Sequence, residues 1–401
     1  MNPHLKNLHA YPFEKLAKLK HGITPPQDKT PILLSMGEPQ HAAPAFIKEA
    51  LVSHLQGLAN YPTTKGLLEL RTAIAQWLAK RFQLGATGIN PETQVLPVNG
   101  TREALFSFAQ CIVDAGVGSP LVVMPNPFYQ IYEGAALLAG AEAYFLNTTA
   151  ETGYLPDFDA VTADVWTRCQ LLYICSPGNP SGEVINQATL VKLIQLAERY
   201  DFVIASDECY SELYADEQQP PPGLLQAAYA MGNTAFKRCV VFHSLSKRSN
   251  VPGLRSGFVA GDADILQHYL LYRTYHGCAM SLPTQHASLL AWQDESHVQE
   301  NRQLYREKYA AFIGILAPVC TITQPPASFY IWLKTPFCDV DFAQRLFAQE
   351  HITVLPGSYL SREFSGINPG QYHVRIALVA PLEDCIIAAE RIKNFFITLT
   401  T

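Results

Sequence analysis

The chain contains 401 residues, of which 48% are hydrophobic and 16% charged, and its formal net charge at pH 7 is −6. This composition is typical of a globular protein, and the length predicts two or three lobes with a sizeable core. The negative charge without a long basic run excludes a nucleic-acid partner, the short apolar stretches exclude a membrane partner, and the histidines lack the spacing of metal ligands.

The N-terminal sequence MNPHLKNLHAYPFEK has no apolar core and no small-residue cleavage site, so it does not have the features of a signal peptide. The nine cysteines form no C-x-x-C pair, and several lie in or beside apolar runs, where a thiol serves as a small buried side chain. We therefore expect a reduced, cytoplasmic protein.

The middle of the chain alternates between short β-rich runs and helical patterns. Helices are predicted over 102–115 and 188–200. The β-rich runs read as strands buried on both faces, and they cover residues 121–125, 171–177, 202–207 and 239–244. Alternation of this kind predicts an α/β fold with a mainly parallel sheet flanked by helices.

The pattern changes near Asp294, where a long charged helical stretch begins. A shorter α+β segment follows and ends in YHVRIALV and a final helix. Since the first 40 residues precede the alternating pattern, we expect them to join this C-terminal part. The sequence therefore predicts a large domain over 41–293 and a smaller α+β domain formed by 1–40 and 294–401.

Polar residues follow three of the predicted strands. Asn179 lies in SPGNPSG, Asp207 and Tyr210 lie in DECY, and Lys247 lies in SLSK. Ligands of an open parallel sheet gather at the carboxyl ends of its strands, so these residues are expected to share one site. A fourth segment, NGTREA at 99–104, opens a helix whose free N–H groups can hold a phosphate.

One end of this site has the chemistry to bind an aldehyde and a phosphate. The amine of Lys247 can form an imine with an aldehyde. The guanidinium of Arg255, eight residues later, can bind a phosphate. Further phosphate donors are the helix-start amides and the nearby hydroxyls, namely Gly100, Thr101, Arg102, Ser244 and Ser246.

The other end has the chemistry to bind an aromatic ring. A carboxylate at the end of a buried strand needs a cation, and a protonated pyridine nitrogen beside Asp207 would supply one. Asn179 and Tyr210 can hydrogen-bond a phenolate oxygen on the same ring, and Tyr129 can stack on its face. An aldehyde, a phosphate, a pyridine and a phenol on one molecule describe pyridoxal 5′-phosphate.

The motifs SPGNPSG, DECY, SLSK with an arginine eight residues later, and HVRIA resemble those of the class I/II, fold-type I aminotransferases, in the same order along the chain. The resemblance implies the pyridoxal-phosphate transferase fold, with Lys247 as the catalytic, Schiff-base lysine and Asp207 as the partner of the pyridine nitrogen. It implies further cofactor contacts from Tyr129, Asn179, Tyr210, Ser244 and Arg255, beside the phosphate donors expected at Gly100, Thr101, Arg102 and Ser246.

The same resemblance implies how the substrate is bound. Arg375 would hold the α-carboxylate of an amino acid or 2-oxo acid, with help from Asn179 and the backbone at Gly37. Tyr61 would reach the phosphate bound by the neighbouring subunit of a homodimer with shared active sites.

Longer stretches, such as NPFYQIYEGAALLAGA and SLSKRSNVPGLRSGFVAGD, are similar to a subgroup, the bacterial N-succinyldiaminopimelate aminotransferases of lysine biosynthesis. This similarity implies exchange of an amino group between N-succinyl-L,L-2,6-diaminopimelate and 2-oxoglutarate. Residues 271–281 carry Tyr272, Arg273, Tyr275 and His276, and are candidates for binding the distal end of the substrate. The alternative is that these aromatic residues pack in a dimer interface.

Several residues also have a structural interpretation. Asp207 could cap a turn, Asn179 could serve turn chemistry, and Tyr129 could be an ordinary core residue. Arg375 could form a structural salt bridge in its apolar strand. The side chain of Arg102 could point away from the cofactor while its backbone N–H binds.

Other functions of the same fold remain open. An aspartate or aromatic aminotransferase or a carbon–sulfur β-lyase would use the same cofactor residues. A pyridoxal-phosphate-binding regulator is disfavoured, because residues 1–35 are too few and too interrupted by proline for a helix-turn-helix segment.

Overall fold

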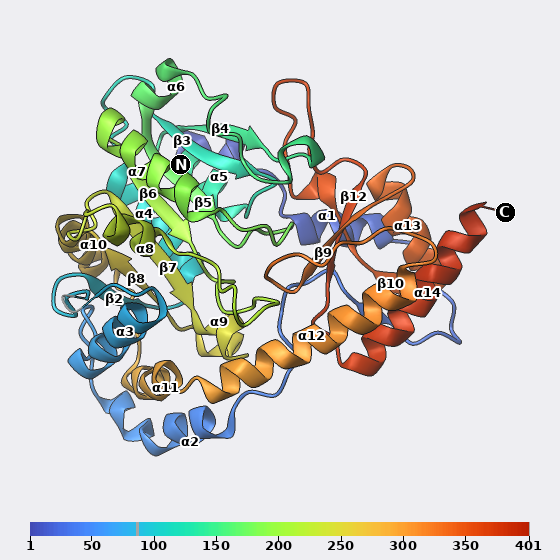
Figure 1. Ribbon diagram of the computed structural model, residues 1–401, viewed down its shortest axis with the longest axis horizontal. Coiled ribbons are helices and arrows are strands. Elements are labelled where there is room, and N and C mark those ends of the chain that lie inside the picture. Colours follow the sequence, from blue (N-terminus) through green and yellow to red (C-terminus); the bar gives the residue numbers. More distant parts are fainter. Residues whose placement is uncertain (86–87, 401) are drawn as a thin grey trace.

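The computed structural model describes residues 1–85 and 88–400 and is built around two sheets (Figure 1). The larger sheet has seven strands in the order β2-β8-β7-β6-β5-β3-β4. All its pairings are parallel except those of β8, which runs antiparallel to β7 and to β2. These strands are β2 (Val95–Val98), β3 (Leu121–Asn126), β4 (Glu142–Asn147), β5 (Cys169–Cys175), β6 (Val203–Asp207), β7 (Cys239–Ser244) and β8 (Gly257–Gly261).

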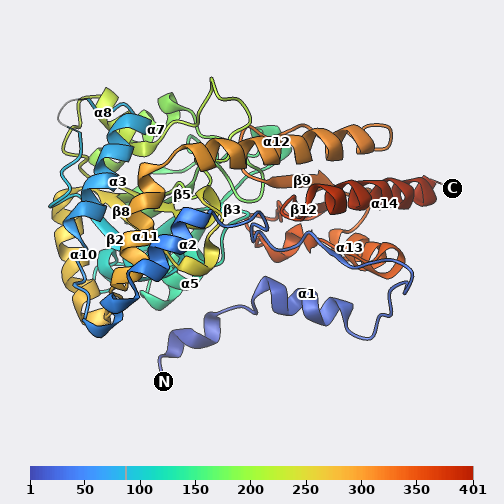
Figure 2. The same ribbon diagram turned by 90° about the horizontal axis from the view of Figure 1, so that it is seen from below.

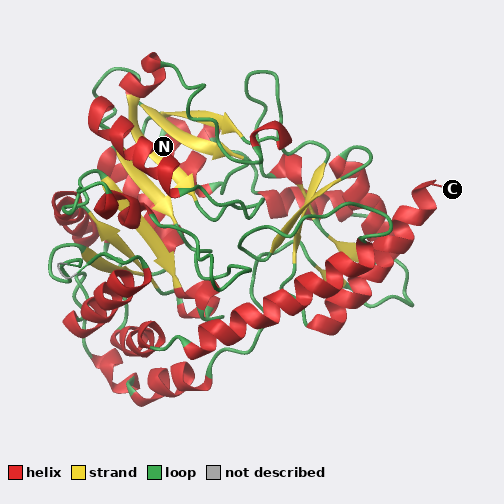
Figure 3. Cartoon of the chain, in the orientation of Figure 1, coloured by secondary structure: helices red, strands yellow, loops and turns green. Residues whose placement is uncertain are grey.

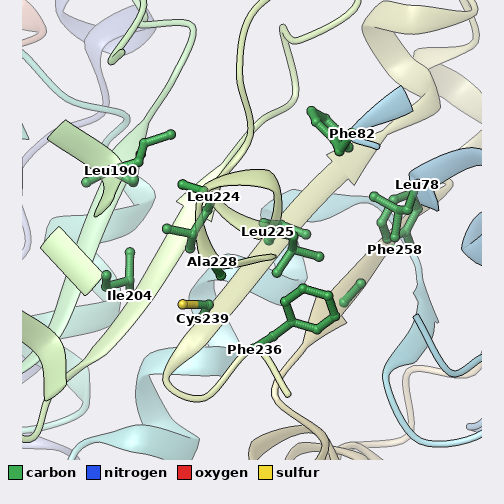
Figure 4. Packing of buried hydrophobic residues seen from close by; sticks show 14 of the residues in the cluster. Leu78, Phe82, Leu190, Ile204, Leu224, Leu225, Ala228, Phe236, Cys239 and Phe258 are labelled. Atoms are coloured by element: carbon green, nitrogen blue, oxygen red, sulfur yellow. The ribbon is translucent and has the colours of Figure 1, made fainter. Parts of the chain in front are cut away.

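Both faces of the large sheet are covered by helices, so its central strands are apolar on both sides. Along β5, Leu172 and Ile174 join one hydrophobic cluster while Leu171 and Tyr173 join another, as the two-residue period of a strand requires. Figure 4 shows part of the first cluster, where Ile204 of the sheet lies among helical leucines. The prediction of an α/β fold with a mainly parallel sheet is confirmed.

Helices α3, α7 and α8 cover one face of this sheet, and α4, α5 and α10 cover the other. The predicted helices over 102–115 and 188–200 correspond to α4 and α7, although α4 ends earlier because Val113 is extended. The helices in this part of the chain are α2 (Ala45–Ser53), α3 (Leu68–Arg81), α4 (Thr101–Ile112), α5 (Ile131–Leu138), α6 (Ala163–Arg168), α7 (Gln187–Tyr200), α8 (Leu224–Ala230), α9 (Leu245–Arg248), α10 (Ala263–His276) and α11 (Leu282–Gln293).

The smaller sheet is antiparallel, with strand order β11-β12-β9, and lies beside a two-stranded parallel pair of β1 and β10 (Figure 3). Its strands are β9 (Tyr330–Lys334), β11 (Leu355–Pro356) and β12 (His373–Ala377), and the pair consists of β1 (Ile32–Leu33) and β10 (Ile352–Thr353). The surrounding helices are α1 (Pro12–Lys20), α12 (Ser296–Leu316), α13 (Asp339–Glu350) and α14 (Leu382–Thr400). Short 3₁₀ helices are η1 (Pro3–Asn7), η2 (Leu55–Ala59), η3 (Ala150–Thr152), η4 (Pro252–Leu254) and η5 (Gly357–Tyr359).

The smaller sheet has a hydrophobic cluster of its own. Ile32 and Leu34, from near the N-terminus, join the cluster that includes Phe312 of α12 and Ile392 of α14. The long helix α12 runs from the large sheet to the small one, and α1 lies below the small sheet in Figure 2. We therefore propose the domain limits expected from the sequence, 41–293 for the large domain and 1–40 with 294–401 for the small one. Among the helices described, none has an apolar stretch long enough to span a membrane.

Candidate active site

A cavity of about 480 Å³ lies where β5, β6 and β7 end and the small sheet approaches. Among the residues predicted for the site, Gly100 and Tyr61 are not part of the cavity lining. The lining contains all the others: Gly37, Thr101, Arg102, Tyr129, Asn179, Asp207, Tyr210, Ser244, Ser246, Lys247, Arg255 and Arg375. Residues separated by more than 300 positions in the sequence thus meet at the carboxyl ends of parallel strands, as the sequence predicts.

Lys247 is presented by the short helix α9, which begins directly after β7. The hydroxyl of Ser244 accepts a hydrogen bond from the N–H of Ser246 at 3.0 Å and so caps this helix. The Lys247 amine donates to the backbone oxygen of Gly37. Burial, assisted by the positive charges of Arg375 and Arg255, lowers the pKa of Lys247 from 10.5 to about 8. A lowered pKa favours the neutral amine, which is the form that attacks a carbonyl or takes a proton.

The phosphate end of the cavity is formed by the start of α4 and by Arg255. Gly100 precedes α4 with φ +80°, and a Cβ atom there would collide with the guanidinium of Arg255. Arg255 donates to the backbone oxygen of Pro252 at 2.9 Å and forms no ion pair with any residue described. The N–H of Gly100 donates to the backbone oxygen of Val98 at 2.8 Å, so the helix-start amides left to bind a phosphate beside the Arg255 guanidinium are those of Thr101 and Arg102.

Asp207, at the end of β6, is buried beside the cavity. Its Oδ2 accepts a hydrogen bond from the hydroxyl of Tyr132 at 2.6 Å, and its Oδ1 accepts one from the N–H of Cys209 at 3.2 Å. Burial raises the pKa of this carboxyl, and the hydrogen bonds from the thiol of Cys209, the hydroxyl of Tyr132 and the N–H of Cys209 oppose that effect. The bond to Cys209 is the local turn contact considered from sequence, so Asp207 makes that contact while still lining the cavity.

Tyr129 and Arg102 lie together at the same cavity. Arg102 Nε donates to the hydroxyl of Tyr129 at 2.6 Å, and its Nη2 donates to that of Tyr11 at 3.2 Å. The suggestion that the Arg102 side chain points away is therefore wrong. Its guanidinium is exposed and carries a positive charge at the cavity wall.

Arg375, on β12, points into the opposite side of the cavity. Its Nη1 donates to Oδ1 of Asn179 at 2.9 Å, and its Nη2 donates to the backbone oxygen of Ser35 at 2.8 Å. Its Nε is buried without a partner, and no carboxylate in the described part of the chain lies within 4.0 Å of its guanidinium. The alternative of a structural salt bridge is therefore wrong. An unpaired buried guanidinium is unfavourable unless an anionic ligand completes it.

Tyr210 faces this guanidinium from the end of β6. Its hydroxyl lies 2.9 Å from that of Tyr330, whose ring is stacked 4.5 Å below the Arg375 guanidinium. Tyr330, like Tyr11 and Tyr132, lines the cavity but was not predicted. The spacing of Tyr132, three residues after Tyr129, could have indicated it; the sequence contains no comparable signal for Tyr11.

Residues 271–281 do not line the cavity of their own chain. Arg273 is completely buried and pairs with both carboxylate oxygens of Glu103, at 2.8 and 3.0 Å. The prediction that Arg273 binds the distal end of the substrate is therefore wrong. Tyr275, by contrast, is 88% exposed on α10, and Tyr61 is fully exposed after η2.

The residues at this cavity fit pyridoxal phosphate. The lysine has a lowered pKa, Gly100 lets the Arg255 guanidinium lie against the start of α4, and the Arg375 guanidinium has no anionic partner among the described residues. Together these groups define a site for a phosphorylated aldehyde and a carboxylate-bearing substrate.

Comparison with known proteins identifies the family. Residues 29–392 match the model of the family described as aminotransferase class I and II. The LL-diaminopimelate aminotransferase of Aquifex aeolicus is 31% identical over 396 residues, covering 97% of both chains. That of Nitratidesulfovibrio vulgaris (Miyazaki F) is 30% identical, covering 90% of this chain and 91% of its own.

Solved structures show the same relationship. An aminotransferase from Neisseria meningitidis Z2491 is 48% identical, with a TM-score of 0.94 and full coverage of both chains. The aminotransferase AspB from Helicobacter pylori 26695 is 36% identical, with a TM-score of 0.89, covering 97% of this chain and 98% of its own. The chain belongs to the class I and II aminotransferase family. It is a pyridoxal-phosphate-dependent enzyme that acts on small amino and 2-oxo acids.

Proposed function

We propose that this aminotransferase exchanges an amino group between N-succinyl-L,L-2,6-diaminopimelate and 2-oxoglutarate, in the synthesis of diaminopimelate and lysine. The similarity of its motifs to the succinyldiaminopimelate subgroup supports this substrate. The LL-diaminopimelate aminotransferases among its relatives support the same substrate class. We also propose a cytoplasmic location, because all nine cysteines are free.

The charge of the cavity is the observation that carries this proposal. The ionisable side chains of the lining include four cations and two carboxylates, namely Arg102, Lys247, Arg255 and Arg375 with Glu38 and Asp207. We assign Arg255 to the phosphate of the cofactor and Arg375 to the α-carboxylate of the substrate. Arg102 then remains for an acidic group at the far end of the substrate. N-succinylation converts the distal ammonium of diaminopimelate into an amide with an added carboxylate, which suits this positive wall.

In the proposed reaction, the Lys247 amine would hold the cofactor through its aldehyde until an amino substrate binds. Lys247 Nζ then takes the proton from the substrate α-carbon, for which its lowered pKa is suited. Arg375 and Asn179 orient the α-carboxylate so that the α-proton faces Lys247. Asp207 keeps a positive charge on the ring nitrogen beside it. When bound, pyridoxal phosphate supplies the electron sink for the electron pair that the departing α-proton leaves on the α-carbon.

We also propose a homodimer with shared active sites. Tyr61 projects fully into solvent and does not line its own cavity, so it can contact a phosphate only in another copy. Exposed apolar side chains precede it in the sequence on α2 and η2, including Val52, Leu55 and Leu58. Such a patch on a globular protein favours an interface. Mixing inactive Tyr61→Ala and Lys247→Ala subunits should restore activity, and a monomer in light scattering would refute the dimer.

A second candidate donor is L,L-diaminopimelate itself, which the names of the relatives favour. The rate constant kcat/KM, with 2-oxoglutarate as acceptor, separates the candidates. N-succinyl-L,L-diaminopimelate should exceed L,L-diaminopimelate, aspartate and tyrosine by at least ~10-fold, which corresponds to about 1.4 kcal/mol of transition-state binding. If aspartate, tyrosine or free diaminopimelate gives the highest value, the proposed substrate is wrong.

Arg102→Gln tests the charge argument separately. In single-turnover reactions with the donor alone, this variant should lose about 10-fold in rate constant with the succinylated donor, and much less with alanine, which lacks a distal acid. Arg199→Gln removes an exposed arginine from α7 and is the matched control. An equal loss with both donors would mean that Arg102 supports the cofactor or Tyr129 instead.

A further inference from the structure

Tyr132 makes a buried hydrogen bond that the proposed reaction does not yet use. Its side chain is fully buried on α5, and its hydroxyl donates to Oδ2 of Asp207 at 2.6 Å. This is shorter than an ordinary neutral hydrogen bond, as expected when the acceptor is a carboxylate. The bond joins residues 75 positions apart, so it depends on the tertiary fold rather than on a local turn.

The ring of Tyr132 is held in place by its neighbours. It stacks on Tyr173 of β5, with ring centres 4.6 Å apart and an interplanar angle of 12°. The Tyr173 hydroxyl donates in turn to the backbone oxygen of Leu105 at 2.6 Å. Tyr129 also packs against the ring in a T-shaped arrangement, with centres 5.9 Å apart and an interplanar angle of 87°. The Tyr132 hydroxyl is therefore aimed at Asp207 by rigid packing.

The carboxylate of Asp207 has few other sources of stabilisation. No lysine or arginine in the described part of the chain lies within 4.0 Å of it, and its remaining hydrogen-bond donors are the N–H and the thiol of Cys209. The titratable groups that face it, from α5, β5, β7 and the neighbouring loops, are Tyr129, Tyr132, Tyr173, Cys175, Cys209 and His243. Burial raises the pKa of the phenol of Tyr132 well above its usual range, so it stays protonated and can donate.

We propose that Tyr132 is a positioning residue, whose hydrogen bond fixes Asp207 in one orientation and keeps it an anion beside the ring nitrogen of the cofactor. This inference rests on the proposed role of Asp207. A donor to a carboxylate makes it a weaker base. The proton shared between Asp207 and the ring nitrogen therefore stays on nitrogen, where it makes the ring a better electron acceptor. Without the Tyr132 hydroxyl, Asp207 is more basic and draws that proton toward itself.

The test compares Tyr132→Phe with Tyr173→Phe in holoenzyme loaded with ¹⁵N-labelled pyridoxal phosphate. Both changes remove one hydroxyl from the same buried stack, but only the first removes a donor to Asp207. In Tyr132→Phe, the ¹⁵N resonance should move toward that of neutral pyridine, and kcat should fall about 10-fold with little change in KM. Tyr173→Phe should keep the resonance of the wild type.

Tyr132→His provides a second test if the phenylalanine variant does not fold. Its ring can still stack, and its N–H can donate to Asp207, so it should keep the protonated resonance. A wild-type resonance in Tyr132→Phe, equal shifts in both phenylalanine variants, or a neutral resonance in Tyr132→His would overturn the proposal. Asp207→Asn serves as the reference: if its ¹⁵N resonance is also that of the wild type, the role of Asp207 itself is wrong.

Discussion

Replacement of Lys247 by methionine should abolish turnover and yet stabilise the apoenzyme near neutral pH. The pKa of Lys247 is lowered from 10.5 to about 8, chiefly by burial. Each pKa unit corresponds to about 1.36 kcal/mol, so the full shift amounts to roughly 3 kcal/mol. The side chain is only partly shielded from solvent and donates to Gly37, which reduces this penalty. We therefore expect Lys247→Met to raise the free energy of unfolding by about 2 kcal/mol.

The sign follows from proton linkage. The native lysine loses its proton near pH 8, whereas the unfolded chain keeps its proton to near pH 10.5. The unfolded state therefore binds more protons between these values, and the stability of the apoenzyme rises with pH there. Methionine removes the penalty of the buried charge. The gain in apoenzyme stability from Lys247→Met, relative to the wild type, should be complete below pH 8 and absent above pH 10.5.

Thermal unfolding of the apoenzymes at pH 7 and pH 10.5 measures this difference. The entropy of unfolding is about 2.1 cal/mol/K per residue, so about 2 kcal/mol in a chain of this size raises Tm by about 2–3 °C. Lys48→Met, an exposed change on α2, is the control for added apolar surface. The reasoning about the buried amine is wrong if Lys247→Met is no more stable than the wild type at pH 7. It is also wrong if the difference in Tm between the two proteins is the same at both pH values.

Two further variants test individual contacts of the site. Asp207→Ala should retain bound cofactor but lower kcat at least ~100-fold, because the ring nitrogen loses its anionic partner; turnover within a few-fold of wild type in a steady-state assay would leave Asp207 with a structural role alone. Arg375→Gln should lower kcat/KM for every amino donor by about 10- to 100-fold, since each loses a charged hydrogen bond to its α-carboxylate; a donor panel showing a loss confined to one substrate would contradict that assignment.

The sequence predicts β3, β5, β6 and β7 of the large sheet, because a strand buried on both faces requires a continuous apolar run, but it did not predict β4 or β8. The position of Lys247 follows from this, since a polar motif at the end of such a run has to lie at the edge of the sheet. Asp207 and Asn179 were found in the same way. No knowledge of distant contacts was needed for these three residues.

The contacts that the sequence did not predict depend on which surfaces meet. Arg273 was a candidate for binding the substrate, but its guanidinium pairs with Glu103, 170 positions away in the sequence. For Arg375, predicted to bind the substrate α-carboxylate, the sequence left a structural salt bridge open as the alternative, but no described carboxylate reaches it. Tyr11 enters the cavity from the N-terminal segment, 91 positions from its partner Arg102. Hydrophobic periodicity indicates that a residue is buried and leaves open what it is buried against.

Reductive trapping of the cofactor tests most directly whether the site is built around Lys247. Borohydride treatment of the holoenzyme, followed by digestion and peptide mapping, should place the phosphopyridoxyl label on Lys247. Lys308 is the most informative competitor, because burial also lowers its pKa to about 8, although it lies on α12 outside the cavity lining. A single label on Lys247 is the predicted result, and a label on Lys308, Lys65 or Lys237 in its place would contradict it.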